Sequence, residues 1–192
     1  MVRVTKIGVV SDTHGFFDPA LRQIFADVAA ILHAGDVGSA EVLDELRLMA
    51  PVHAVKGNVD PPELGLPLSL TRPIGGLRVE MLHILPAPQS QLEAWARSSP
   101  LKPRECANQQ AFFRSFDSAT RLVIFGHSHE PCLAKVGEIA FFNPGSAGKK
   151  RFSLPRSCGL LDLRAGSMEL TILSLEGYNR EVIRRMSLRL GE

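Results

Sequence analysis

Short runs of apolar residues, each the length of a β-strand, recur along the chain. They cover residues 6–10, 29–32, 52–55, 77–82 and 121–125. Between the first three runs the apolar positions follow a helical period. Helices are expected after Asp18-Pro19 and after Ser39, because these residue types are favoured at helix starts. The alternation predicts three parallel strands joined by two helices up to Asp60, with right-handed crossovers.

The second half of the chain has a different pattern. Strands are expected at residues 139–142, 158–163 and 168–173. The last two are separated by a short polar turn at residues 164–167, which predicts a hairpin. We expect these strands to form a second, mixed layer of sheet. A short helix within residues 179–189 is expected to close the chain.

Side chains that can bind metal ions follow the ends of the apolar runs in the first two thirds of the chain. They are Asp12, His14, Asp36, Asn58, Asp60, His83, His127 and His129. In open α/β sheets ligands bind outside the carboxyl ends of the strands, so these side chains are expected to converge on one site. Asp12 and His14 are two residues apart, and in an extended chain such a pair points to the same face. Helix caps or turn formers would explain individual residues but not the whole series.

The composition is that of an ordinary folded domain. The chain has 192 residues, of which 45% are hydrophobic and 22% charged, and a single domain is expected over residues 1–192. A formal net charge of +2 does not indicate a nucleic-acid partner. Three widely spaced cysteines favour neither a disulfide framework nor a thiolate zinc site. No signal peptide and no apolar run of about 18 residues is found, so a cytoplasmic protein without a membrane partner is expected.

The types of donor group favour divalent metal ions. Carboxylate, imidazole and carboxamide groups suit Mn²⁺, Fe²⁺ or Zn²⁺, and the set differs from a thiolate site. Six or seven such groups are too many for one tetrahedral ion. Two ions about 3.5–4 Å apart would share a carboxylate and a water, lower the pKa of that water, and clamp the attacking and leaving oxygens at phosphorus. The pattern therefore favours an anionic, phosphate-containing substrate.

The ordered series Asp-x-His, Gly-Asp, Gly-Asn-x-Asp, His and Gly-His-x-His resembles that of the calcineurin-like metallophosphoesterase superfamily, and in particular its small single-domain bacterial and archaeal phosphodiesterases. The resemblance covers about residues 6–163 and includes the run Asn143-Pro144-Gly145-Ser146. It implies a four-layer αββα sandwich of two facing mixed β-sheets flanked by helices. It also implies a metal-dependent phosphodiesterase with two divalent ions, and a bridging hydroxide that attacks phosphorus in line. Mn²⁺ is the first expectation, with Fe²⁺, Zn²⁺ or Ni²⁺ as alternatives.

The resemblance assigns roles to residues by position. One ion would be held by Asp12, His14, Asp36 and His129. The other would be held by Asp36, Asn58, His83 and His127, with Asp36 shared. Asp60 would orient a ligating histidine or the substrate, and it joins Asp36 and Asn58 as an expected catalytic residue. The substrate phosphate would be bound by backbone N–H groups of the run with Asn143, Gly145 and Ser146. Arg151 would also bind it, with Arg156 as the replacement for Arg151.

Two positions depart from the pattern of that family. Val59 stands where many members have a histidine that protonates the leaving group, so slow hydrolysis of esters with basic leaving groups is expected. The alternative proton donor to the leaving group is Asp60, acting through a water molecule. His83 has the apolar neighbours Met81-Leu82 and Ile84-Leu85, where the family usually has Thr and Gly. The alternative for His83 is a hydrogen-bonded imidazole in the core.

The segment 87–120 is longer than its counterpart in the small relatives. It is expected to form one or two amphipathic helices around Pro100 and Pro103. We interpret it either as a packed excursion whose aromatic residues complete the core, or as a lid or subunit contact that sets substrate choice. The sequence leaves homo-oligomer formation open.

A second function, from another class, also stays open. The retromer subunit that resembles this family is a metal-binding scaffold for protein interactions, and such proteins have lost ligands, whereas the predicted ligands are present here. Within the enzyme class the sequence does not separate diesters, monoesters and nucleotide anhydrides.

Two further histidines lie outside the series. We expect His33 to make a hydrogen bond behind the ligands, and His53 to be a core or edge residue.

Overall fold

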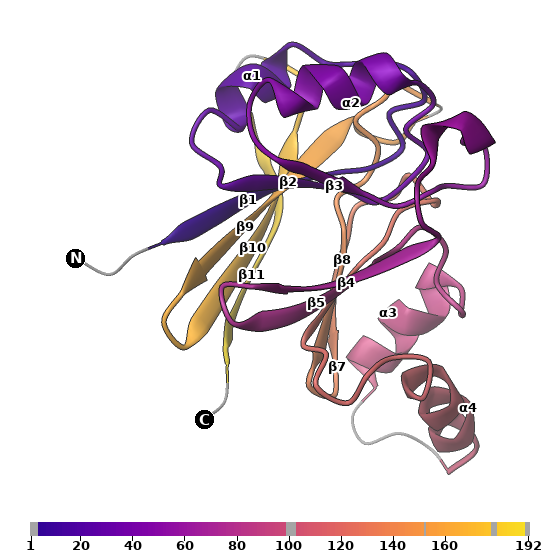
Figure 1. Ribbon diagram of the computed structural model, residues 1–192. Coiled ribbons are helices and arrows are strands. Elements are labelled where there is room, and N and C mark those ends of the chain that lie inside the picture. Colours follow the sequence, from indigo (N-terminus) through magenta and orange to yellow (C-terminus); the bar gives the residue numbers. More distant parts are fainter. Residues whose placement is uncertain (1–3, 99–102, 152, 178–179, 191–192) are drawn as a thin grey trace.

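The computed structural model of the chain describes residues 4–98, 103–151, 153–177 and 180–190. In this part of the chain, two mixed β-sheets face each other and helices cover the outer face of each sheet (Figure 1). The layers therefore follow the order αββα, which confirms the fold that the family resemblance implied.

The first sheet contains the parallel strands that the sequence predicts. Its strands are β1 (Thr5–Val10), β2 (Ala30–His33), β3 (Val52–Ala54), β9 (Ser157–Arg164), β10 (Ser167–Ser174) and β11 (Val182–Arg189). Their order across the sheet is β11-β10-β9-β1-β2-β3. Strands β1, β2 and β3 are parallel, and helices α1 (Ala20–Ile24) and α2 (Ala40–Arg47) connect them. The predicted order of alternating strands and helices is confirmed.

The second sheet combines parallel and antiparallel pairs. Its strands are β4 (Ser69–Ile74), β5 (Leu77–Leu82), β6 (Leu122–Ile124), β7 (Cys132–Val136) and β8 (Ile139–Asn143), in the order β4-β5-β6-β8-β7. The three central strands are parallel, and the edge strands β4 and β7 are antiparallel to their neighbours. The sequence does not predict these two edge strands. In β4 most side chains are exposed, so the strand lacks the apolar alternation by which a half-buried strand is found.

Strands β9 and β10 correct one prediction. The sequence pattern places both in the second sheet, whereas β9 pairs antiparallel with β1 and β10 pairs with β9, so both extend the first sheet. Of the strands predicted in the second half of the chain, β8 is the one that lies in the second sheet. Alternation along a strand defines its two faces but not its neighbour, and tertiary packing decides the pairing.

The C-terminal segment corrects a second prediction. The sequence predicts a short helix within residues 179–189, whereas β11 is a strand paired antiparallel with β10. The register shifts beside Leu173, which pairs with Val182. A β-bulge adds one residue to one strand and interrupts the two-residue alternation of side chains. The partly buried Ile183 and Met186 are therefore three residues apart, a spacing that also fits a helix.

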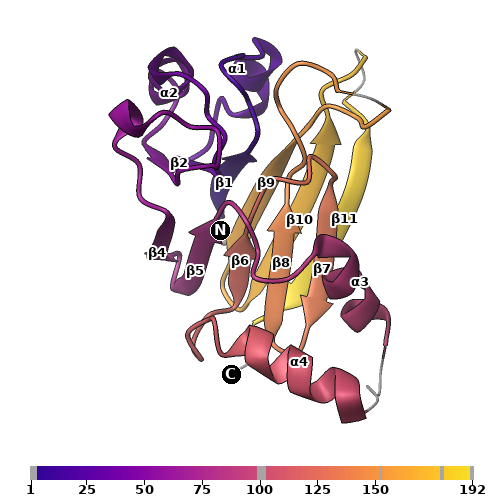
Figure 2. The ribbon, with the colours of Figure 1, turned by 90° about the vertical axis from the view of Figure 1, so that its right-hand side faces the viewer.

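A buried apolar cluster fills each of the three interfaces between layers. Phe141 and Phe142 are consecutive on β8 and fully buried on its two faces. Phe142 belongs to the cluster between the sheets, and Phe141 packs under helices α3 (Gln89–Arg97) and α4 (Pro103–Phe113) (Figure 2). Phe25 is buried in the third cluster, between the first sheet and its helices. Because both faces of each sheet are covered, the metal-binding side chains are left at the ends of the strands.

The segment 87–120 contains α3 and α4 and contributes aromatic side chains to the core. Trp95, Phe112 and Phe116 are all buried. The Phe112 ring lies 5.2 Å from both the Trp95 and the Phe116 ring, between centroids. Such aromatic pairs add to the stabilisation that comes from area burial. For these side chains the structure supports the interpretation as a packed excursion.

Two of the three cysteines lie in the described core. Cys132 and Cys158 are free and buried, and burial raises the pKa of each thiol to about 12. Both are therefore weak nucleophiles, as the sequence predicts. The side chain of Cys106 lies outside the described residues. No helix in the described ranges has the length and apolar character that a membrane crossing requires.

Candidate metal centre

The two sheets bring five strand exits to one place. Asp12 and His14 follow β1 and lie against the loop after β2, with Asp12 N–H donating to Gly35 O at 3.0 Å and His14 N–H donating to Asp36 O at 2.9 Å. In the second sheet, which lies opposite, the loop after β6 contacts the end of β5, where Gly126 N–H donates to His83 O at 3.1 Å. The predicted convergence at the carboxyl ends of the strands is thus seen in both sheets.

Two glycines permit this close approach. A Cβ atom added to Gly57 would lie 2.0 Å from Asp36 Oδ1, and one added to Gly126 would lie 2.0 Å from Ser11 Oγ and 2.8 Å from Asp12 Oδ2. Any larger residue at either position would displace a carboxylate of the site. The glycine that precedes Asn58 and the glycine that precedes His127 are therefore explained by packing against the site.

The predicted ligands have unusual backbone conformations. Positive φ angles are found at Asp12, His14, Asp36, His127 and His129, with values between 49° and 71°. Among described residues other than glycine, Arg180 is the one further case. Such angles are uncommon for residues with a Cβ atom and cost free energy, so they persist where the surrounding structure imposes them, often at functional sites. The strain therefore coincides with the residues predicted from the sequence.

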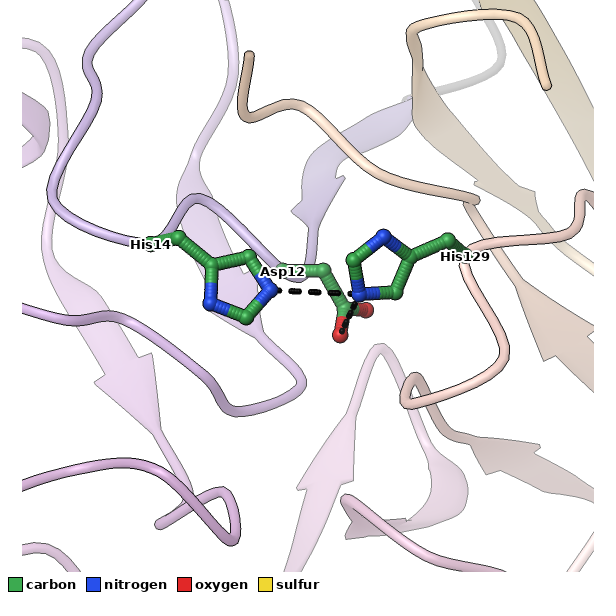
Figure 3. Close-up of side chains that lie close together, drawn as sticks. All are labelled: Asp12, His14 and His129. Carbon is green, nitrogen blue, oxygen red and sulfur yellow. Dashed lines mark hydrogen bonds and ion pairs between the residues drawn. The ribbon is translucent and has the colours of Figure 1, made fainter. Parts of the chain in front are cut away.

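Asp12, His14 and His129 form the first group of donors (Figure 3). His129 Nε2 lies 3.1 Å from His14 Nε2 and 3.2 Å from Asp12 Oδ1. Asp12 is fully buried, and its Oδ2 accepts a hydrogen bond from His127 N–H at 3.1 Å. Apart from the contact with His129, Asp12 Oδ1 accepts no hydrogen bond among the described residues. A buried carboxylate oxygen with so few donors is costly unless a cation compensates it.

Asp36, Asn58, His83 and His127 form the second group. His83 Nε2 lies 3.3 Å from Asp36 Oδ2 and 3.1 Å from Asn58 Oδ1. His127 Nδ1 lies 3.0 Å from the same Asn58 oxygen. Asp36 Oδ2 is also 3.9 Å from His14 Nε2, so this carboxylate stands between the two groups. The structure thus brings together every residue that the resemblance names as a ligand.

The surroundings of His83 fix which ring nitrogen faces the site. His83 Nδ1 lies 2.7 Å from Ala34 O, a carbonyl that can only accept, so Nδ1 carries a proton. In the neutral ring Nε2 then has a free lone pair that faces Asp36 and Asn58. A backbone carbonyl behind a ligating imidazole is the usual arrangement at metal sites. The apolar neighbours of His83 therefore do not prevent it from acting as a ligand.

Asp36 is ionised in this arrangement. Burial would raise the pKa of its carboxyl group, but the contact with His83 and the hydrogen bond from Val59 N–H lower the pKa to about 2. In return, the contact with Asp36 raises the pKa of His83 against the effect of burial. A carboxylate that stays negative over the working pH range is the electrostatic condition for holding a divalent ion.

Asp60 has a different position from the expected one. Its Oδ1 accepts a hydrogen bond from Gly38 N–H at 2.7 Å, and its Oδ2 accepts one from Gly57 N–H at 2.8 Å. Both oxygens are therefore used to hold the loops that carry Asp36 and Asn58, whereas the family resemblance implies contact with a histidine or the substrate. Asp60 is also buried, which leaves it poorly placed to act as an acid through water.

The run from Asn143 to Ser146 lies behind the donors. Asn143 is fully buried, and its Nδ2 donates to Gly126 O and to Ser128 Oγ, each at 3.0 Å. Ser146 Oγ donates to Asp12 O at 2.8 Å. The family resemblance implies that backbone N–H groups of this run contact the substrate phosphate. Gly145 N–H instead donates to Asn143 Oδ1 at 2.9 Å, and the side chains of Asn143 and Ser146 hold the ligand loops. They position the site from inside the protein.

Gln89, at the start of α3, is a site residue that the sequence does not indicate. Its Oε1 accepts hydrogen bonds from Ser128 Oγ at 2.7 Å and from Asn143 Nδ2 at 3.2 Å. Its Nε2 donates to Glu130 O at 3.3 Å. These contacts join the segment 87–120 to the loop that carries His127 and His129. A single glutamine after a proline gives no sequence signal for such a role.

The Gln89→Ala variant tests this positioning role. We expect the affinity for a divalent ion, with Mn²⁺ as the probe in calorimetry of chelator-stripped protein, to fall about 10- to 100-fold, because the supports of ligating residues typically contribute that much to metal affinity. Gln91→Ala, at an exposed position of the same helix, is the matched control and should leave this affinity unchanged. Unchanged metal affinity in Gln89→Ala would contradict the positioning role.

The two candidate arginines differ in availability. Arg151 is exposed, and burial together with the charge of its guanidinium lowers the pKa of His14. Arg156 pairs with Asp18, and its Nε donates to Gly148 O at 2.7 Å. Arg156 is therefore engaged elsewhere, and Arg151 is the arginine available to a bound anion.

His33 makes the hydrogen bond expected behind the ligands. Thr13 Oγ1 donates to Val37 O at 2.9 Å and lies 2.9 Å from His33 Nε2, so this nitrogen carries the proton. The buried Nδ1 atom has no partner among the described residues. Burial lowers the pKa of His33 from 6.5 to about 4. The ring is therefore neutral in the folded protein at physiological pH.

His33 is expected to make stability depend on pH. The pKa of His33 is lower in the folded state than in the unfolded state, so its contribution to the free energy of unfolding is complete above pH 6.5 and is lost as the pH falls to about 4. The total loss is about 3 kcal/mol. The measurement is urea unfolding of chelator-treated wild type and His33→Gln across this range. The variant should show a smaller loss of unfolding free energy at acid pH. Parallel curves for the two proteins would rule out this contribution.

Comparison with known proteins places the chain in a family. Residues 5–166 match the model of the calcineurin-like phosphoesterase superfamily domain. A probable metallophosphoesterase of Methanothermobacter thermautotrophicus is 32% identical over 156 residues, which are 78% of this chain and 81% of that protein. The chain belongs to the calcineurin-like phosphoesterase superfamily. The resemblance based on the ordered motifs is confirmed.

Solved structures share the fold. YfcE, a phosphoesterase from E. coli, has a TM-score of 0.62 and 21% identity, with 95% of this chain and 98% of that chain covered. Vps29 from Entamoeba histolytica, solved in complex with Zn²⁺, has a TM-score of 0.68 and 20% identity, with 97% of this chain and 100% of that chain covered. At these identities the likeness concerns the arrangement of the two sheets and the helices.

Proposed function

We propose that this chain is a metal-dependent phosphodiesterase whose converged donor atoms hold two divalent ions, with Mn²⁺ as the first expectation and Fe²⁺, Zn²⁺ or Ni²⁺ as alternatives. The observation that carries the proposal is a continuous series of donor atoms, in which neighbours lie 3.0–3.9 Å apart. It runs through His127, Asn58, His83, Asp36, His14, His129 and Asp12. Membership of the family supports metal-dependent phosphoester hydrolysis as the general chemistry.

The donor set fits two divalent ions. Asp12, His14 and His129 would hold one ion, Asn58, His83 and His127 would hold the other, and Asp36 would be shared. Asp12 Oδ1 is buried and its one close polar neighbour in the described structure is His129 Nε2 at 3.2 Å, so a cation held by these two groups would compensate its charge. Imidazole nitrogen and carboxylate or amide oxygen are ligands that first-row divalent ions accept.

The protein contributes a rigid arrangement of charges and donors. When bound, two such ions supply positive charge to the phosphoryl oxygens and lower the pKa of a water molecule. Asp60 and Asn143 hold the ligand loops through backbone hydrogen bonds, so the donors need little rearrangement when substrate binds. Arg151 would attract the anionic phosphate from the side of His14.

The motif series supports a diester over a monoester as substrate, because the small single-domain members that it resembles are phosphodiesterases. A phosphodiester carries one negative charge at neutral pH, whereas a phosphomonoester carries close to two. A comparison of the two kinds of ester therefore tests the substrate class.

The test compares hydrolysis of bis(p-nitrophenyl) phosphate and p-nitrophenyl phosphate by chelator-stripped protein, before and after Mn²⁺ addition. We expect activity to appear with Mn²⁺, to be higher on the diester, and to be lost in His127→Ala. His53→Ala is the matched control, since His53 lies on β3 outside the donor series. Retained activity in His127→Ala, or a preference for the monoester, would contradict the proposal.

The alternative is a metal-binding scaffold without turnover. It shares the fold and the capacity to bind metal, so the two functions are separated by hydrolysis. Folded protein that binds Mn²⁺ but cleaves neither ester with Mn²⁺, Fe²⁺, Zn²⁺ or Ni²⁺ would favour the scaffold. The presence of the complete donor series favours the enzyme.

A further inference from the structure

Exposed apolar side chains border the second group of donors. Leu68 is 77% exposed and Ile84 is 48% exposed, which are large values for leucine and isoleucine. Scattered apolar residues are normal on protein surfaces and need no explanation. These two instead share a hollow with Asn58 and His83, which are proposed metal ligands. Their position next to the reacting centre points to contact with substrate.

Two hollows flank these donors, and Ile84 lines both. The first has a volume of about 320 Å³ and is lined by Lys56, Asn58, Leu68, Leu82, His83 and Ile84. The second has a volume of about 420 Å³ and is lined by Ile84, Leu85, Pro86, Pro88, Phe125 and His127. Both volumes fall in the lower range of sites that bind small organic molecules. The Ile84 side chain therefore lies between the two hollows and contributes to both.

The hollows open beside the atoms that would contact a phosphate. Asn58 Oδ1 lies 3.1 Å from His83 Nε2 in the first hollow and 3.0 Å from His127 Nδ1 in the second. A phosphate held at these donors would therefore direct its ester groups toward one hollow or the other. The exposed surface that lines them is more apolar than polar, although Ser69, Gln89 and Ser128 also contribute to it. Lys56 is the one with a permanent charge among the described lining residues.

The chain that follows His83 is apolar. Ile84, Leu85 and Pro86 continue directly from this proposed ligand and line the second hollow. A phosphate held at the donors would therefore have its organic group in apolar surroundings on this side of the site.

From these observations we propose that the substrate is a phosphodiester with an uncharged apolar ester group, aryl or alkyl, that packs on Ile84 in these hollows. This inference rests on the proposed function. Hydrolysis forms one bond from the water oxygen to phosphorus and breaks the bond from phosphorus to the leaving oxygen, which takes up a proton from the water. The products are a phosphomonoester and an alcohol or phenol. The apolar residues around His83 then have a role in substrate binding.

The first test measures binding without turnover. Phenylphosphonate and methylphosphonate are titrated by calorimetry into Mn²⁺-loaded protein, and they differ only in the apolar group. We expect phenylphosphonate to bind about tenfold more tightly, since burial of apolar area favours binding and the hollows are open to solvent on one side. In Ile84→Ser this ratio should fall toward one. Equal affinities in the wild type would overturn the inference.

Two further variants separate the apolar surface from the metal site. Leu68→Ser changes the same hollow at a residue that is not adjacent to a donor in sequence, and it should also lower the ratio of affinities. Leu48→Ser is the matched control, because Leu48 is 75% exposed at the end of α2 and lines neither hollow. It should keep the wild-type ratio. A ratio unchanged in both Ile84→Ser and Leu68→Ser would overturn the inference.

The second test uses two diesters with the same leaving group, methyl p-nitrophenyl phosphate and phenyl p-nitrophenyl phosphate. We expect kcat/KM with Mn²⁺ to be about tenfold higher for the phenyl ester, and the preference to be lost in Ile84→Ser. Turnover of both esters at equal kcat/KM would overturn this inference alone. No turnover of either ester by metal-loaded protein would overturn the proposed function, and this inference with it.

Discussion

Replacing Asp36 with asparagine is expected to lower kcat/KM for bis(p-nitrophenyl) phosphate by about 10³-fold or more. Asp36 Oδ2 lies 3.3 Å from His83 Nε2 and 3.9 Å from His14 Nε2, so this carboxylate belongs to both donor groups. Its pKa is about 2, because the His83 contact and the hydrogen bond from Val59 N–H outweigh the effect of burial. Asparagine keeps the shape and removes the charge. A loss of that size corresponds to about 4 kcal/mol of transition-state stabilisation.

The fold should tolerate this change. Asparagine Oδ1 can still accept the hydrogen bond from Val59 N–H, which is 3.1 Å long in the wild type. Asp44→Asn is the matched control, since Asp44 is exposed on α2 and pairs with Arg47 at 2.8 Å. The control should keep wild-type kcat/KM, and circular dichroism should show both variants folded. A folded Asp36→Asn variant with kcat/KM within tenfold of wild type would show that Asp36 is not a shared ligand.

The rate of hydrolysis is expected to fall steeply as the leaving group becomes more basic. Val59 is 56% exposed beside Asn58, where many members of the family have a histidine, and a valine side chain cannot donate a proton. Asp60 does not replace that histidine, because both of its oxygens hold backbone N–H groups. General acid catalysis typically raises the rate 10²- to 10⁴-fold. The loss of rate caused by its absence should therefore be largest for esters with poor leaving groups.

A series of methyl aryl phosphates, from 4-nitrophenyl to phenyl, measures this dependence at a constant second ester group. In Val59→His the dependence should be weaker, with kcat/KM for the phenyl ester raised at least about tenfold. Leu48→His adds a histidine at an exposed position at the end of α2 and is the control. A wild-type rate that is the same for all leaving groups would show that another group already supplies the proton.

The sequence predicts the donor residues because they follow strands with a clear apolar pattern. A strand exit is a local feature, and the parallel order of β1, β2 and β3 brings their exits to one edge of the first sheet. The donors after β5 and β6 reach the same place because the second sheet packs face to face on the first. His83 could be placed in the series although its neighbours are apolar.

The supporting residues could not be predicted in the same way. The place of Asn143 and Ser146 in a motif predicts contact with the substrate, whereas their side chains donate hydrogen bonds to Gly126 O and Asp12 O. Gln89 supports the His127 loop from a helix that is far away in sequence. Such contacts are decided by tertiary packing, and no period or spacing along the chain reports them.

The fold shows the same limit. The bulge between β10 and β11 interrupts the alternation on which strand prediction depends, so the last strand resembles a helix in its sequence pattern. The placement of β9 and β10 in the first sheet is a choice of partner strand, and both sheets offer an apolar face. A strand or helix can be predicted from the local sequence, whereas the strand with which it pairs depends on contacts between residues that are far apart in the sequence.

The central claim is that the converged donor atoms bind two divalent ions, and the stoichiometry of metal binding tests it most directly. Chelator-stripped protein is titrated with Mn²⁺, and free Mn²⁺ is followed by electron paramagnetic resonance. We predict two ions bound per chain in the wild type and fewer than two in Asp36→Asn, with Asp44→Asn like the wild type. Binding of at most one ion by folded wild-type protein, or two ions in Asp36→Asn with unchanged affinity, would contradict this account.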